Sequence, residues 1–154
     1  MSSFLRKVGL FSHLDLPQLG QIESICQQLQ VPSGWVLFRE GDEPDHFFVL
    51  MKGQVKISRV IPGLGEETLA MLEAGSYFGE MEIFEPKPRA AQAVAATPCT
   101  LQAIKIAELN AAMNADRELT IGVLWSFVLT LSERLRATND KVTAHFAQAT
   151  SINS

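Results

Sequence analysis

Hydrophobic residues recur at two different spacings along the chain, and the change of spacing divides it into three parts. From Phe4 to Gln30, apolar residues follow one another at intervals near three and four, interrupted once by Pro17. This predicts two short helices with a bend between them. From Val31 to Ile106, short runs rich in β-branched and aromatic residues replace that spacing, and beyond Ile106 the helical spacing returns.

The middle part contains short apolar runs that predict strands. They are Trp35–Phe38, Phe47–Met51, Val55–Ile61, Thr68–Leu72, Ala91–Ala95 and Leu101–Ile106. Turn-forming stretches such as PSG, EGDEPD, PGLGEE and EPKP separate them. The pattern predicts a mixed α and β fold, in which an antiparallel β barrel or jelly roll is flanked by N-terminal helices and a long C-terminal helix. We expect a single domain over residues 1–154, with its barrel at about 31–106 and its C-terminal helical part at about 107–146.

The C-terminal part predicts a short helix around Leu109–Met113 and a long one from about Arg117 to Phe146. An apolar seam with alternating spacings of four and three follows the long helix through Leu124, Val128, Leu131, Leu135, Thr138, Val142 and His145. Such a seam is typical of a coiled coil. Around Ile121 and Trp125, packing on the barrel is an equally good interpretation. From Leu131 onward the polar flanks favour a second helix, and hence a homodimer.

Composition and charge narrow the classes of function. The chain has 154 residues, 47% of them hydrophobic, enough for the core of one domain. Its net charge is −4 and its Lys and Arg residues are scattered, which argues against a nucleic-acid surface. No apolar run is long enough to cross a bilayer, so we expect no membrane association and a cytoplasmic protein. Cys26 and Cys99, expected in a helix and a strand, are interpreted as buried free thiols.

Residue types that support catalysis or metal binding do not gather in the sequence. His13, His46 and His145 fall in different predicted elements, which argues against the metal enzymes that also use jelly rolls. No Ser-His-Asp or Cys-His arrangement is indicated. We therefore expect neither an enzyme nor a metal site. The phenylalanines Phe47, Phe48, Phe78 and Phe84 are interpreted as core residues rather than base-stacking platforms.

The stretch FGEMEIFEPKPRAAQ, from Phe78 to Gln92, carries the candidate chemistry. A short helix can open at Glu80 and end before Pro86 and Pro88, and the backbone N–H groups at a helix start attract anions. The planar fork of Arg89 can hold two phosphate oxygens. A carboxylate only accepts hydrogen bonds, so Glu80 suits a sugar hydroxyl. The stretch indicates a ligand that carries both a phosphate and a sugar.

Phe78-Gly79-Glu80 followed by Pro88-Arg89-Ala90-Ala91 resembles the phosphate-binding cassette of the cyclic nucleotide-binding domain family. The preceding VPSGWVLFREGD, DHFFVLMKGQVKI and EAGSYFGE resemble the strands and turns of that family, and the resemblance covers about Leu10 to Val142. It implies an eight-stranded jelly roll with helices on either side.

The resemblance also implies roles for single residues. Glu80 would accept the ribose 2′-OH and Arg89 would pair with the cyclic phosphate, while the backbone N–H groups of Glu82 and Ala90 complete the cradle. Gly79, Met81 and Ala91 belong to the same cassette. Members selective for cGMP usually carry threonine at the position of Ala90, so cAMP is favoured over cGMP.

The stretch ERLRATNDKV, Glu133 to Val142, resembles the dimer helix of the bacterial catabolite activator proteins. This implies that Thr138, and Asn139 from the facing subunit, meet the adenine amino group. That family continues into a DNA-binding helix-turn-helix and this sequence stops, so we do not expect it to act alone as a transcription factor. We expect it to act on a downstream protein.

Glu82 departs from the family, which usually has alanine or glycine there. A carboxylate within roughly 6 Å of a phosphate would cost about 2 to 3 kcal/mol of binding. We therefore expect its side chain to point away or to weaken binding, and Glu82→Ala to keep or improve cAMP affinity. The sequence thus favours a cAMP-binding regulatory protein. The alternative is a ligand-free barrel of the same fold that serves as a dimerisation or protein-interaction module.

Overall fold

The computed structural model describes Leu5, residues 8–85 and residues 87–153, with the backbone alone for residues 150–153. The N-terminal elements are η1 (Gly9–Phe11) and α2 (Leu16–Ser24). The strands are β1 (Cys26–Val31), β2 (Val36–Phe38), β3 (His46–Lys52), β4 (Val55–Ile61), β5 (Gly65–Leu72), β6 (Tyr77–Phe78), β7 (Gln92–Ala95) and β8 (Cys99–Lys105). The short helix η2 (Met81–Ile83) lies between β6 and β7, and α3 (Ile106–Ala115) and α4 (Arg117–Asn153) follow β8.

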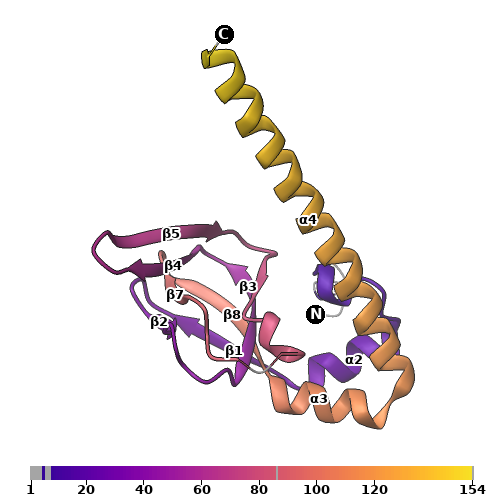
Figure 1. The fold of residues 1–154 in the computed structure, drawn as a ribbon. Helices are drawn as coiled ribbons and strands as arrows, with labels where there is room; N and C mark the ends of the chain where they lie inside the picture. Colours follow the sequence, from indigo (N-terminus) through magenta and orange to yellow (C-terminus); the bar gives the residue numbers. More distant parts are fainter. Residues whose placement is uncertain (1–4, 6–7, 86, 154) are drawn as a thin grey trace.

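Within the described residues the strands form two antiparallel four-stranded sheets, in the orders β1-β8-β3-β6 and β2-β7-β4-β5. Figure 1 shows them facing each other, with the helices gathered beside the first sheet. The predicted mixed α and β class and the jelly roll are confirmed.

The first sheet is the middle layer of the molecule, and β3 shows why. Phe48 and Leu50 point into the barrel and join one apolar cluster, whereas Phe47 and Val49 point outward and join the cluster under the helices. Because side chains alternate along a strand, a run that is buried at every position must be covered on both faces. The helices are therefore packed against the barrel itself.

Of the two predicted N-terminal helices, the first is only the three-residue η1 among the described residues, and α2 matches the pattern at its start but not at its end. Asp15 caps α2 by accepting a hydrogen bond from the Gln18 N–H at 2.9 Å, and Pro17 stands in the first turn, as the predicted bend requires. The expected helix to Gln30 is wrong: α2 ends at Ser24 and Cys26 begins β1, which pairs with β8. Phe4 lies outside the described residues.

Other boundaries also differ from the sequence prediction. The strand β6 was not predicted, because a two-residue strand carries no periodicity. Ile106, expected to end a strand, begins α3. The last helix continues to Asn153 rather than ending near Phe146.

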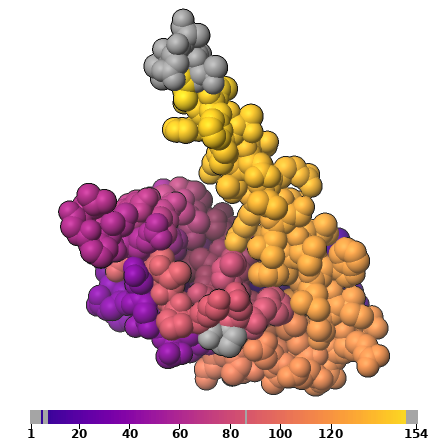
Figure 2. Space-filling view, viewed as in Figure 1, coloured from indigo at the N-terminus to yellow at the C-terminus, as the bar shows by residue number. Residues whose placement is uncertain are grey.

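Helix α4 is anchored to the molecule by its N-terminal half. Leu119 and Val123 are fully buried, and the Ser126 hydroxyl accepts a hydrogen bond from the His13 N–H at 3.0 Å. Ile121, Trp125 and Val128 are 43%, 59% and 55% exposed, so they do not pack on the barrel of their own chain. Figures 1 and 2 show the far half of α4 projecting away from the barrel. No helix among the described residues is long and apolar enough to span a membrane.

Candidate functional site

A cavity of about 390 Å³ lies between the barrel, the η2 segment and α4. This volume falls in the range of small-molecule sites in proteins. The lining residues described are Phe38, Ile57, Ala70, Leu72, Tyr77, Phe78, Gly79, Glu80, Met81, Glu82, Arg89, Ala90, Ala91 and Arg134. Apolar side chains thus form most of the wall, and four charged groups are concentrated on the side of η2 and α4.

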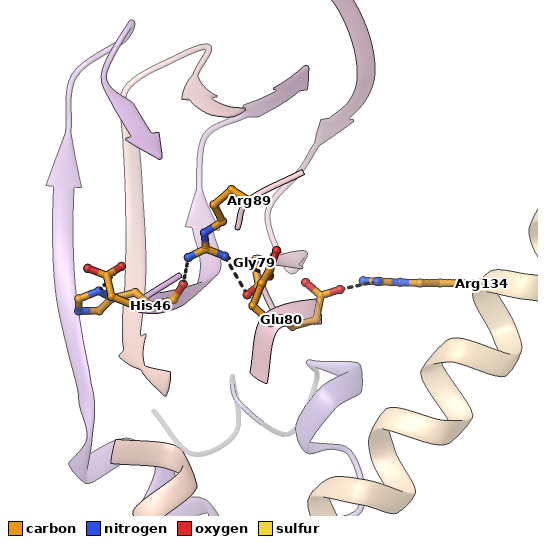
Figure 3. Close-up of polar contacts among 7 residues, drawn as sticks. His46, Gly79, Glu80, Arg89 and Arg134 are labelled. Atoms are coloured by element: carbon orange, nitrogen blue, oxygen red, sulfur yellow. Dashed lines mark hydrogen bonds and ion pairs between the residues drawn. The ribbon is translucent and has the colours of Figure 1, made fainter. Parts of the chain in front are cut away.

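Arg89 is held by its backbone and by its side chain. Its N–H donates to Asp42 O at 2.9 Å, and its own carbonyl accepts from the Gly41 N–H at 2.8 Å. The guanidinium lies 4.1 Å from the centre of the Phe38 ring. Its Nη2 donates to the His46 carbonyl and its Nη1 donates to the Gly79 carbonyl at 3.1 Å (Figure 3). These contacts fix a positive charge at the wall of the cavity.

Arg89 is nevertheless not saturated. It is 3% exposed, and its Nε has no hydrogen-bond partner among the described residues. Burial lowers its pKa from the ordinary value, and the carboxylates of Glu82, Asp45 and Asp42 oppose that change. An unpaired N–H in a buried position costs free energy, so Arg89 has unused hydrogen-bonding capacity beside the cavity.

Gly79 lets the chain pass close to this guanidinium. It has φ +79°, and a Cβ on it would lie 2.8 Å from Arg89 Nη1. A side chain at this position would meet both an unfavourable backbone conformation and a clash. The glycine is therefore required by the close approach of the cassette to Arg89.

Glu80 is buried, at 4% exposure, and pairs with a residue of α4. Arg134 Nη1 lies 2.5 Å from Glu80 Oε1 (Figure 3), and the Arg134 guanidinium lies 4.9 Å from the centre of the Tyr77 ring. Burial alone lowers the pKa of Arg134, but the hydrogen bond and the charge of Glu80 raise it above its ordinary value. The ion pair connects the cassette directly to α4.

Glu82 points toward Arg89 rather than away from it. Its Oε2 lies 3.2 Å from Arg89 Nη1, and its side chain is 12% exposed. We expected the Glu82 side chain either to point away from the anion site or to weaken binding there. The structure rules out the first of these alternatives.

Seven of the nine candidate residues named from the sequence line the cavity: Gly79, Glu80, Met81, Glu82, Arg89, Ala90 and Ala91. Thr138 and Asn139 are not among the described lining residues. They lie on the exposed part of α4, where the Thr138 hydroxyl donates to the Arg134 carbonyl at 2.9 Å. Pro86, expected to help end the η2 helix, lies outside the described residues.

The sequence analysis missed Arg134. A usable signal was present, because Arg134 stands four residues before Thr138 and therefore lies one helical turn nearer the barrel on the same face. Nothing in the pattern alone pairs it with Glu80, 54 residues earlier.

A second contact joins η2 to α4. Phe84, which directly follows η2, packs edge-on against Phe127 with ring centres 4.9 Å apart. Phe47, Phe48 and Phe78 are buried as expected, whereas Phe84 is 39% exposed and belongs to this contact instead. The cassette is therefore connected to α4 by one polar and one aromatic contact.

Among the described residues, no three His, Cys, Asp or Glu side chains come together as a metal site would require. The charged groups of the cavity suit an organic ligand with a phosphate and a hydroxyl.

The family model described as "Cyclic nucleotide-binding domain" matches residues 28–116, more than half of the chain. The chain belongs to the cyclic nucleotide-binding domain family. The predicted resemblance is confirmed. The cassette lies within the matched segment, and so do the described residues that line the cavity, except Arg134.

Several relatives in this family are similar over much of the chain. A CRP-like cAMP-activated global transcriptional regulator of Mycobacterium tuberculosis is 27% identical over 142 residues, covering 92% of this chain and 62% of the regulator. The chain thus spans less than two thirds of that relative.

Solved structures of the family include close matches of shape. The N-terminal domain of a transcriptional regulator from Streptomyces coelicolor A3(2) has a TM-score of 0.75 and 32% identity, covering 90% of this chain and 94% of that one. The regulatory domain of Toxoplasma gondii PKA, co-crystallised with cAMP, has a TM-score of 0.68 and 27% identity, covering 71% of this chain and 42% of that one.

Proposed function

We propose that this chain is a cyclic nucleotide receptor, with cAMP favoured over cGMP, that acts by binding and regulation rather than by catalysis. One observation carries the proposal: Glu80 and Arg89 line one cavity of suitable size, and Arg89 has a buried N–H with no hydrogen-bond partner among the described residues. The cyclic phosphate would lie against Arg89, and a ribose hydroxyl would donate to Glu80.

The preference for cAMP rests on Ala90 and on the relatives. Ala90 lines the cavity and has no hydroxyl to offer a guanine amino group. The mycobacterial relative is described as cAMP-activated, and the Toxoplasma regulatory domain was crystallised with cAMP. These findings support cAMP as the first ligand to test.

The output would be a rearrangement of α4. A ribose that hydrogen-bonds Glu80 shares this carboxylate with Arg134, so ligand binding changes the strength of the contact between cassette and helix. A ligand shifts a conformation only by its different affinity for two arrangements. The Glu80–Arg134 and Phe84–Phe127 contacts are where such a difference would arise.

A homodimer through α4 is part of the proposal. Leu124, Val128, Leu131 and Leu135 are between 38% and 62% exposed on the described chain, and they belong to the predicted seam. A second copy of α4 would cover this seam by coiled-coil packing. Thr138, and Asn139 of the second copy, would then face the nucleotide base.

The ligand-free interaction module stays as a second candidate because one observation favours it. Glu82 already supplies a negative partner to Arg89, so the structure can balance this charge without a nucleotide.

Thermal unfolding with and without nucleotide separates the two candidates. Mass action stabilises any native protein by about 2.7 kcal/mol at a ligand concentration of 100 Kd. We expect the melting temperature to rise by several degrees with cAMP, less with cGMP and not with 5′-AMP. Native mass spectrometry of the same sample reports the oligomer and any retained nucleotide. An unchanged melting temperature at millimolar cAMP and cGMP would favour the interaction module.

A further inference from the structure

The four charged groups of the cavity are already paired with one another. Arg134 pairs with Glu80, and Arg89 pairs with Glu82. The Arg89–Glu82 pair is the more enclosed of the two, since its side chains are 2% and 12% exposed, whereas Arg134 is 47% exposed. The four charges that line the cavity therefore balance one another within the chain.

A second anion at Arg89 would disturb this balance. Two negative groups on one buried cation repel each other strongly, because little water separates them. Arg89 lines the cavity, so a phosphate can approach its guanidinium, and its Nε–H has no hydrogen-bond partner among the described residues. Once the phosphate is bound at Arg89, the Glu82 carboxylate lies next to a second negative group. It is then better solvated outside the cavity.

We propose that Glu82 is an internal counter-ion that occupies the anion position of Arg89 and leaves it when the ligand phosphate binds. This inference rests on the proposed function and deepens it. Glu82 then sets the affinity of the site, because each binding event includes the loss of the Glu82–Arg89 pair. As a consequence, the receptor would need a higher nucleotide concentration to fill its site than it would without this carboxylate.

Removing the carboxylate should have two opposite effects. Without ligand, Glu82→Gln leaves the buried Arg89 charge without its counter-ion, so the melting temperature should fall. With ligand, the competition is gone, and we expect cAMP to bind at least about tenfold more tightly, since a hydrogen bond to a charged group is worth about ten- to a hundredfold in an equilibrium constant. A residue that only supports the local structure would lower both stability and affinity.

The experiment is calorimetric titration of cAMP into wild type, Glu82→Gln and Glu82→Ala, with melting curves of each protein without ligand. Glu85→Gln is the matched control: it removes one negative charge three positions away, where the Glu85 side chain is 68% exposed and pairs with Lys87 at 3.1 Å. Glu82→Ala gives a second variant should Glu82→Gln fail to fold.

Tighter binding by the Glu82 variants, with Glu85→Gln unchanged, supports the counter-ion. Equal or weaker binding by folded Glu82 variants, while wild type binds cAMP, overturns this inference and leaves the proposed function standing. If neither wild type nor the Glu82 variants bind cAMP or cGMP, the proposed function fails and the inference fails with it.

Discussion

Arg134 on α4 and Glu80 in the cassette lie 2.5 Å apart between charged atoms, and this pair joins the long helix to the cavity. Glu80 is buried whereas Arg134 is half-exposed, so the carboxylate is the more enclosed partner of the pair. In the proposed mechanism, this contact is the one that a bound nucleotide would change.

Breaking this pair should loosen α4 from the cassette. Arg134→Gln leaves the buried Glu80 carboxylate without its cation, which should lower stability by about 1 to 3 kcal/mol. Hydrogen exchange should become faster in α4 near residues 130–138. Arg136→Gln is the control, because Arg136 contacts only Ser132, at 3.4 Å, among the hydrogen bonds described. Equal exchange in both variants would show that the pair does not hold the helix.

Arg89→Ala should remove most of the cAMP affinity. The loss of a charge-assisted contact to phosphate is expected to cost about 2 to 5 kcal/mol, or more than about thirtyfold in affinity. Titration measures the loss, and circular dichroism should show the fold retained. Arg39→Ala, which removes an exposed arginine near the same loop, should bind as wild type does. Unchanged affinity in Arg89→Ala would remove the cassette from the proposed site.

Gly53 and Gly34 provide a matched pair for the packing of the barrel. Both have positive φ, at +97° and +87°. A Cβ at Gly53 would lie 2.8 Å from Cys99 Sγ and would also meet the Pro98 carbonyl, whereas no described atom lies within 4 Å of a Cβ at Gly34. Gly34→Ala should cost about 1 to 2 kcal/mol of stability through the backbone alone. Gly53→Ala should cost about 1 to 3 kcal/mol more through overpacking, as measured by denaturant unfolding. Equal costs would contradict this packing.

The α4 seam can be tested by adding charge to it. Leu135 and Val142 are 62% and 49% exposed on the described chain. Leu135→Glu combined with Val142→Glu should weaken the proposed homodimer by at least about tenfold, because carboxylates would be buried in an apolar seam. Light scattering after size exclusion, over a range of protein concentration, measures this. Ala137→Glu, off the seam, should leave the assembly unchanged.

The sequence predicted the jelly roll because most strands carry one buried face and end at strong turns. It misplaced β1, since Cys26 and Leu29 also continue the helical spacing of Ile22 and Ile25. The pairing of β1 with β8 makes this segment a strand rather than a helix. Such pairing is a long-range interaction, which the local spacing of apolar residues cannot predict.

The residues of the cassette could be predicted from the sequence, but the charged partners of its side chains could not. Gly79, Glu80 and Arg89 were named because residue type and spacing point to phosphate and sugar and because the stretch resembles the family's cassette, and the structure brings all three to one cavity. The partners of Arg89 and Glu80 were not predicted, because the Glu82–Arg89 pair depends on how η2 folds beside Arg89 and the Glu80–Arg134 pair joins residues 54 positions apart. The expectation that this chain does not bind nucleic acid stays a prediction from its net charge of −4.

Because α4 projects beyond the barrel, a small tilt at its base would move its far end by a larger distance, as in a lever. From Arg134 to Asn153 the helix rises by about 28 Å at 1.5 Å per residue. A tilt of about 10° at the Glu80 contact would carry its free end sideways by about 5 Å, a displacement close to one helical turn. If the proposed coupling holds, a change of the hydrogen-bond partner of Glu80 would thereby become a movement large enough for a neighbouring protein to detect.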